Sequence, residues 1–174
     1  LELSRPGDSS IGTIRGTLTI NSGATVKTTT INSLGWGAGT KVDTVNINGG
    51  LLENVGSGDQ GWGLTVNMTG GEMRSNGGVS NTSGQYYSLG GGSAINTLAS
   101  ATSSVISGRI HLREGNPSGA LPFTVADGAA ATDLLVSAAI TQQGGSHGIT
   151  KSGAGTMSLT GANTYTGLTT VNND

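Results

Sequence analysis

The chain has 174 residues, of which 32 are glycine and only 10% are charged, and its net charge at pH 7 is −2. Glycine at more than twice its usual frequency of roughly 7%, among many Thr, Ser and Asn residues, argues against long helices. The weakly acidic balance argues against a nucleic-acid partner, which requires a basic face. The absence of cysteine excludes disulfides and thiolate metal sites.

Short alternating strands separated by small polar turns recur along the N-terminal part of the sequence. Residues 17–26, 44–52 and 64–73 each combine an alternating strand, a turn with one or two glycines, and a second short strand. Repeats of roughly 20–50 residues are typical of solenoids, and period-2 alternation makes this solenoid β. We therefore predict an all-β, right-handed parallel β-helix of roughly seven or eight coils, in which Ile20, Ile47 and Met68 occupy equivalent places.

The later part of the sequence is less regular. Residues 76–92, rich in Gly, Ser and Asn around Tyr86-Tyr87, predict an irregular loop that leaves the coil. The strand pattern resumes at residues 105–112, and an apolar run follows at 134–141. We expect residues 1–174 to form a single β-helix segment of a larger protein, without membrane insertion and with open ends that permit end-to-end self-association.

The C-terminal stretch carries the most specific pattern. Residues 151–167, KSGAGTMSLTGANTYTG, resemble the autotransporter-associated β-strand repeat, and the repeat extends over about 148–172. The resemblance implies corner glycines at Gly153 and Gly155 and inward residues at Met157 and Leu159. It also implies that Asn163 and Tyr165 form the next corner and strand. Leu168 departs from the family, which usually has glycine there, and Met157 replaces the usual leucine.

The resemblance also implies a biological setting. Such repeats belong to the passenger regions of exported bacterial proteins, where they assist folding during export and form a stalk. We therefore expect an extracellular or outer-membrane-surface location and a non-catalytic adhesive or structural role.

Residues suited to catalysis or metal binding are dispersed. Glu53 and Glu72 follow successive Gly-Gly turns and are expected near each other on adjacent coils, as two carboxylates on a solvated face. His111 and His147 lack ligand spacing. We predict no catalytic residues, metal or cofactor. A polysaccharide lyase or hydrolase and an ice-binding β-helix are less favoured alternatives, because the first needs clustered charges and the second an unbroken threonine array.

The two tryptophans are the best candidates for ligand binding. Trp36 and Trp62 stand in near-identical Gly-Trp-Gly contexts, each just before a predicted strand. Equivalent loops on successive coils would place the indoles side by side as a platform for sugar rings, extended by Tyr86 and Tyr87. The alternative is that each indole covers a corner of its coil. The platform would make the chain a carbohydrate-binding module whose partner is a polysaccharide or a host or cell-surface glycan.

Overall fold

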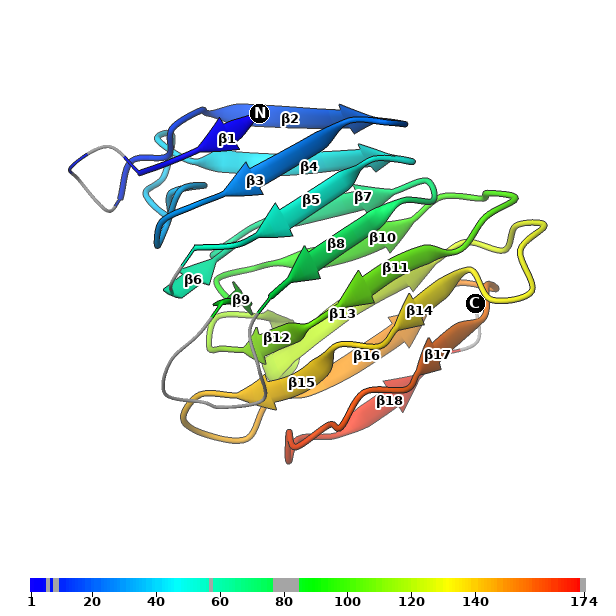
Figure 1. Ribbon diagram of the computed structural model, residues 1–174. Coiled ribbons are helices and arrows are strands. Elements are labelled where there is room, and N and C mark those ends of the chain that lie inside the picture. The colour runs from blue at the N-terminus through cyan, green and yellow to red at the C-terminus, as the bar shows by residue number, and fades with distance from the viewer. Residues whose placement is uncertain (6, 8–9, 57, 77–84, 173–174) are drawn as a thin grey trace.

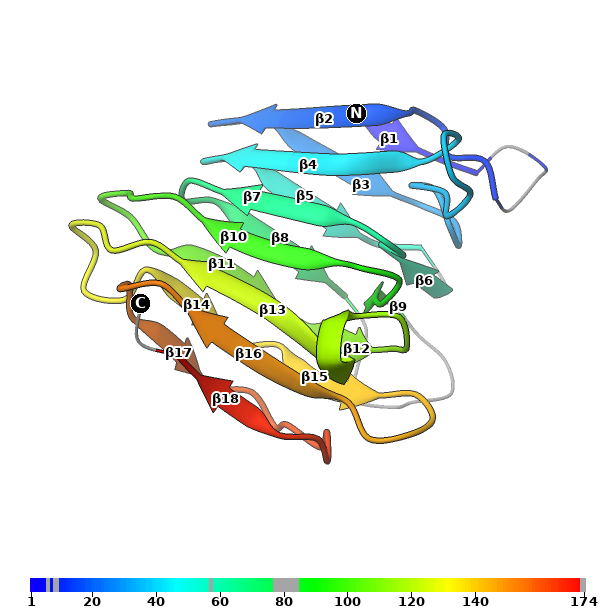
Figure 2. The ribbon, with the colours of Figure 1, turned by 180° about the vertical axis from the view of Figure 1, so that it is seen from behind.

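The chain winds into a parallel β-solenoid of about five turns. The computed structural model describes residues 1–5, 7, 10–56, 58–76 and 85–172. Two long sheets face each other across the core. A short third sheet runs along one edge of the solenoid, where β6, β9, β12 and β15 stack from coil to coil (Figures 1 and 2). The predicted fold class is confirmed, although the number of turns is lower than the seven or eight expected.

The front sheet of Figure 1 has seven parallel strands. They are β1 (Glu2–Leu3), β3 (Thr25–Thr28), β5 (Leu51–Asn54), β8 (Glu72–Ser75), β11 (Ser104–Ser107), β14 (Leu134–Val136) and β17 (Met157–Leu159). The back sheet, which faces the viewer in Figure 2, also has seven. They are β2 (Gly16–Asn21), β4 (Val42–Asn48), β7 (Thr65–Met68), β10 (Ala94–Thr97), β13 (Ala120–Val125), β16 (Gly148–Ser152) and β18 (Thr169–Val171).

The third sheet has four parallel strands. They are β6 (Gly58–Gln60), β9 (Gln85–Leu89), β12 (Arg109–Leu112) and β15 (Ala139–Gln142). The described part of the chain has a single short helical turn, η1 (Pro117–Gly119), between β12 and β13. None of the described residues forms a helix long and apolar enough to cross a membrane.

The core consists of apolar columns that run from coil to coil. Ile20 pairs with Ile47, and Ile47 pairs with Met68, so the predicted equivalence of these three residues is confirmed. Val66 and Ile95 are fully buried neighbours in the next column of the same sheet. Because strand side chains alternate between two faces, each coil adds its apolar residues to these columns and turns the residues between them outward.

Small polar residues hydrogen-bond along the outward face of the back sheet. Asn67 Nδ2 donates to Asn46 Oδ1, and Asn96 Nδ2 donates to Asn67 Oδ1, both at 2.9 Å. Asn46 Nδ2 extends this asparagine ladder to Thr19 Oγ1 at 3.4 Å. The ladder gives these side-chain amides hydrogen-bond partners on the neighbouring coils. Its asparagines stand in a column where an ice-binding array would need threonines.

The predicted irregular loop at 76–92 requires a correction. Its residues 77–84 lie outside the described residues, whereas residues 85–89 form strand β9 of the third sheet. The Gly-, Ser- and Asn-rich composition obscured this strand. Its backbone pairs in register with both β6 and β12, and such tertiary pairing overrides weak local propensity.

Candidate functional site

Trp36 and Trp62 lie at the same corner of successive coils, just before β4 and β7. Both line a surface pocket of about 340 Å³, which we call the tryptophan corner. The other described residues that line it are Asn32, Arg113 and Glu114. Trp36 is 47% exposed and Trp62 is half-buried. The structure therefore brings the two indoles together at one pocket, as the repeated Gly-Trp-Gly sequence predicted.

Trp62 packs against the backbone of the next coil. A Cβ atom at Gly91 would lie 2.4 Å from the indole, so the close approach requires glycine there. The guanidinium of Arg113 lies 4.8 Å from the centre of the Trp62 ring, in cation–π contact. Arg113 also pairs with Glu114 at 3.0 Å. Trp62 thus covers a corner of the coil and lines the pocket at the same time.

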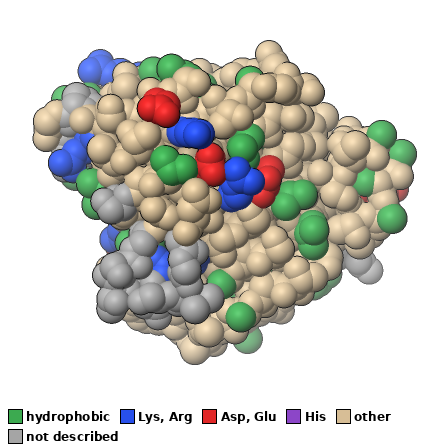
Figure 3. All heavy atoms as spheres, in the orientation of Figure 1, with side chains coloured by type: hydrophobic (Ala, Val, Ile, Leu, Met, Phe, Trp, Pro, Cys, Tyr) green, Lys and Arg blue, Asp and Glu red, His purple; other side chains and the backbone are tan. Residues whose placement is uncertain are grey.

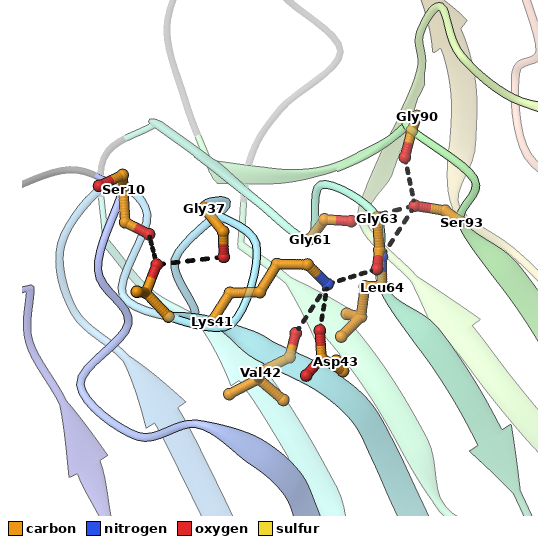
Figure 4. A network of polar contacts seen from close by, with 11 residues as sticks. Ser10, Gly37, Lys41, Val42, Asp43, Gly61, Gly63, Leu64, Gly90 and Ser93 are labelled. Carbon is orange, nitrogen blue, oxygen red and sulfur yellow. Dashed lines mark hydrogen bonds and ion pairs between the residues drawn. The ribbon is translucent and has the colours of Figure 1, made fainter.

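Hydrogen bonds fix the loop that carries Trp36 (Figure 4). The Ser10 carbonyl accepts hydrogen bonds from the backbone N–H groups of Trp36, at 3.1 Å, and Gly37, at 2.9 Å. The Thr40 hydroxyl lies 3.1 Å from both the Ser10 and the Gly37 carbonyls. The N-terminal segment therefore holds this loop in place.

Lys41 joins the two tryptophan loops (Figure 4). Its Nζ donates to the Gly63 carbonyl at 2.6 Å and pairs with Asp43 at 3.0 Å. On the following coil, the Ser93 hydroxyl lies 3.1 Å from the Gly61 carbonyl oxygen and 2.7 Å from the Gly90 carbonyl oxygen, so it can donate to either. These contacts fix the spacing of the loops, so the tryptophan corner is preorganised.

The two tyrosines do not extend this corner. Tyr87 is fully buried in the core, and its hydroxyl lies 3.4 Å from the Leu52 carbonyl. Burial raises the pKa of Tyr87, and the charge of Glu53 raises it further. Tyr86 faces the opposite side of β9, where its ring contacts Arg109 and His111. Adjacent residues of a strand point to opposite faces, so the pair could not act as one platform.

Three lining residues were missed by sequence reasoning. Residues 109, 111 and 113 are polar and alternate with the apolar Ile110 and Leu112, so the sequence could have predicted that the Arg113 side chain points away from the core. Which coil corner it reaches depends on the pairing of β12 with β9 and could not be read locally. Asn32 and Glu114 lie in turns and carried no comparable signal.

Arg74 holds both carboxylates of the Glu53–Glu72 pair, which the sequence predicted to be neighbours on a solvated face. Glu72 pairs in register with Leu51, whereas Glu53 pairs with Arg74. Arg74 lies 2.9 Å from Glu53 and 3.6 Å from Glu72, so both acids are near each other but share one cation. Glu53 is buried, in contrast to the predicted exposed position. The described residues include no group of three His, Asp or Glu side chains that could hold a metal ion.

The last coil has most of the predicted corner geometry. Gly153 has a φ of +82°, and a Cβ atom there would lie 2.4 Å from the Val125 carbonyl oxygen. Met157 and Leu159 are partly buried and pack against the core. Asn163 Oδ1 accepts a hydrogen bond from the Ile140 N–H at 2.9 Å. Tyr165 lies before the next strand, β18, and is not part of it.

Comparison with known proteins identifies this coil. Residues 149–173 match the family model of the passenger-associated-transport-repeat. The match covers most of the stretch predicted to be an autotransporter-type repeat, so that resemblance is confirmed. The chain matches no curated protein and no solved structure.

Proposed function

We propose that this chain, whose last coil matches a passenger-associated-transport-repeat, is a non-catalytic structural segment of the passenger of an exported, surface-displayed bacterial protein. The observation that carries the proposal is that the coil of residues 149–173 stacks on the sheets formed by the preceding described strands. Strand β16 of this repeat pairs in register with β13 on the preceding coil and with β18 on the other side. The repeat is therefore a template on which neighbouring coils can form.

The solenoid suits a stalk because each coil is stabilised by its neighbours. Its apolar columns and its asparagine ladder repeat the same contacts from coil to coil. A structure of this kind extends the chain away from its attachment point without needing a separate core for each unit. Its function is then reach and presentation, which require no active site.

Disruption of the last coil tests this role. Gly153→Val places a side chain against the Val125 carbonyl, at a φ that disfavours branched residues. We expect this variant of an exported fusion to lose surface display, measured by antibody labelling of intact cells. Gly23→Val is the matched control, because Gly23 also has a positive φ but has no atom within 4 Å of its Cβ position. Equal display of both variants, or turnover of a polysaccharide by the purified chain, would overturn the proposal.

The tryptophan corner supports a second candidate function, binding of a polysaccharide or a cell-surface glycan. One exposed and one half-buried indole line a pocket that also contains an amide and an ion pair. Aromatic rings stack on the apolar faces of sugars, and amide and charged groups can bind sugar hydroxyls. The chain would then carry its own adhesive site on the stalk.

Tryptophan fluorescence tests this candidate directly, because the chain has only two tryptophans. Trp62→Phe leaves Trp36 as the sole reporter, and Trp36→Phe leaves Trp62. We expect a saturable fluorescence change with at least one soluble polysaccharide, retained in both single variants and accompanied by loss of binding in Trp36→Ala/Trp62→Ala. Pull-down binding that is unchanged in the double variant would contradict a role for this corner and would leave the stalk function intact.

A further inference from the structure

The outward face of the third sheet carries a buried polar cluster that the proposed function does not use. We call Tyr86, Ser88, Arg109, His111 and Thr141 the third-sheet cluster. The register places Ser88 beside His111, and His111 beside Thr141. Arg109 is two residues before His111 on β12, so both side chains face the same way. Apart from Tyr86, each of these residues is at most 5% exposed.

Arg109 is a fully buried cation without a hydrogen-bond partner among the residues that the structure describes. Its Nε, Nη1 and Nη2 atoms are all buried, and no described group accepts a hydrogen bond from them. Its guanidinium lies 4.4 Å from the centre of the Tyr86 ring, which holds it in place by cation–π contact. A buried charge that lacks hydrogen bonds is costly, and arginine does not relieve the cost by losing its proton.

Other groups of the third-sheet cluster add hydrogen-bonding capacity. The Ser88 hydroxyl is buried and has no hydrogen-bond partner among the described residues. His111 Nδ1 lies 2.8 Å from the Thr141 hydroxyl. Burial, and to a lesser extent the charges of Arg109, Arg113 and His147, lower the pKa of His111 from 6.5 to about 4. His111 is therefore neutral at physiological pH, and Arg109 is the cation of the cluster.

We propose that the third-sheet cluster binds an oxyanion, either a carboxylate or a sulfate or phosphate group. Arg109 supplies the charge and a planar fork of donors that matches two oxygens of such a group. Ser88 supplies a further donor from the neighbouring strand, and Tyr86 positions the guanidinium. This site is separate from the tryptophan corner and from the stalk function.

Nuclear magnetic resonance of the intact chain tests the proposal. Sodium sulfate or sodium glucuronate replaces sodium chloride at constant ionic strength, and the Arg109 Nε–H resonance is followed at pH 7. We expect a saturable shift below about 50 mM anion. In a separate pH titration, the bound anion should raise the pKa of His111 above about 4, because it neutralises the charge of Arg109. Saturation by sulfate alone would identify a tetrahedral anion, and saturation by glucuronate alone a carboxylate.

Variants of the same strand separate this site from general salt effects. Arg109→Gln should abolish the response of His111, whereas Arg113→Gln, at the tryptophan corner, should preserve it. Ser88→Ala should weaken binding by about 3–10-fold, and it provides a test if Arg109→Gln does not fold. The absence of a saturable shift with either anion in the wild-type chain would overturn the proposal. A response of Ser88→Ala or Arg109→Gln equal to that of the wild type would overturn it as well.

Discussion

Arg74 donates two hydrogen bonds to one carboxylate oxygen of Glu53 on the preceding coil, from Nη2 at 2.9 Å and from Nε at 3.2 Å. The pair belongs to a column of alternating charge on the front sheet, because Glu2 pairs with Lys27 and Lys27 with Glu53. Figure 3 shows acidic and basic side chains together on this face of a largely uncharged surface. Burial alone would raise the pKa of Glu53, but hydrogen bonds from Arg74 and Asn76 and the charges of Arg74 and Lys27 lower it below its usual value.

Loss of Arg74 is expected to destabilise the solenoid. Arg74→Met leaves the buried Glu53 carboxylate without its cation, and we expect the free energy of unfolding to fall by about 1–3 kcal/mol in urea titrations at pH 7. Because Glu53 has a lowered pKa when folded, the pair stabilises above the usual glutamate pKa and loses this effect as the pH falls through the lowered value. The difference between wild type and variant should therefore shrink in acid. Glu53→Gln/Arg74→Met should recover part of the loss, and an unchanged urea midpoint for Arg74→Met would contradict this account.

Stability should decrease in acid because of His111. Its pKa is about 4 in the folded chain, against 6.5 for an unperturbed histidine. Between these values the unfolded chain binds more protons, so stability rises with pH from about 4 to 6.5 and is level above. As the pH falls from 6.5 to about 4, we expect protonation of His111 to lower the free energy of unfolding by up to about 3 kcal/mol. His111→Gln should flatten the pH profile of the urea midpoint there, and an unchanged slope would rule out His111 as its source.

The asparagine ladder should contribute measurably to stability. Asn67 donates to Asn46 and accepts from Asn96, so Asn67→Ala removes two hydrogen bonds between coils. We expect a loss of about 1–2 kcal/mol, measured by urea unfolding. Asn48→Ala is the control, since Asn48 makes a single exposed contact to Asn21 at 3.3 Å and its loss should cost about 0.5 kcal/mol or less. Equal effects of the two variants would show that the ladder adds nothing.

Close backbone packing at Gly108 should make it intolerant of any side chain. Gly108 turns the chain from β11 into β12 with a φ of +82°, and a Cβ atom would lie 1.9 Å from the Ser75 carbonyl oxygen. Gly92 has a similar φ of +87° but no atom within 4 Å of its Cβ position. Gly92→Ala should therefore cost about 1 kcal/mol from backbone strain alone, and Gly108→Ala at least 2 kcal/mol more. Similar thermal midpoints for the two variants would show that the coils can separate at this corner.

Several features could be predicted because they depend on local sequence. Alternation and glycine turns set the class of fold, because period 2 and positive φ are properties of a few consecutive residues. The C-terminal repeat was recognisable for the same reason, since its corner glycines and inward residues lie within one coil. The duplicated Gly-Trp-Gly segments predicted neighbouring indoles because both precede strands that pair on successive coils.

Other features depend on how coils of unequal length stack, and only the tertiary structure decided them. The apolar columns set the register, so Glu72 lies opposite Leu51 and Arg74 opposite Glu53. The third sheet adds a strand to the middle coils, so each of them uses more residues and the chain forms fewer coils. Strand β9 of this sheet directs the Tyr86 side chain outward and the Tyr87 side chain into the core. The same pairing of β9 with β12 brings Arg113 to Trp62 and buries Arg109 on Tyr86. These contacts join residues more than twenty positions apart, and burial of the apolar columns, not any local preference, fixes which of them meet.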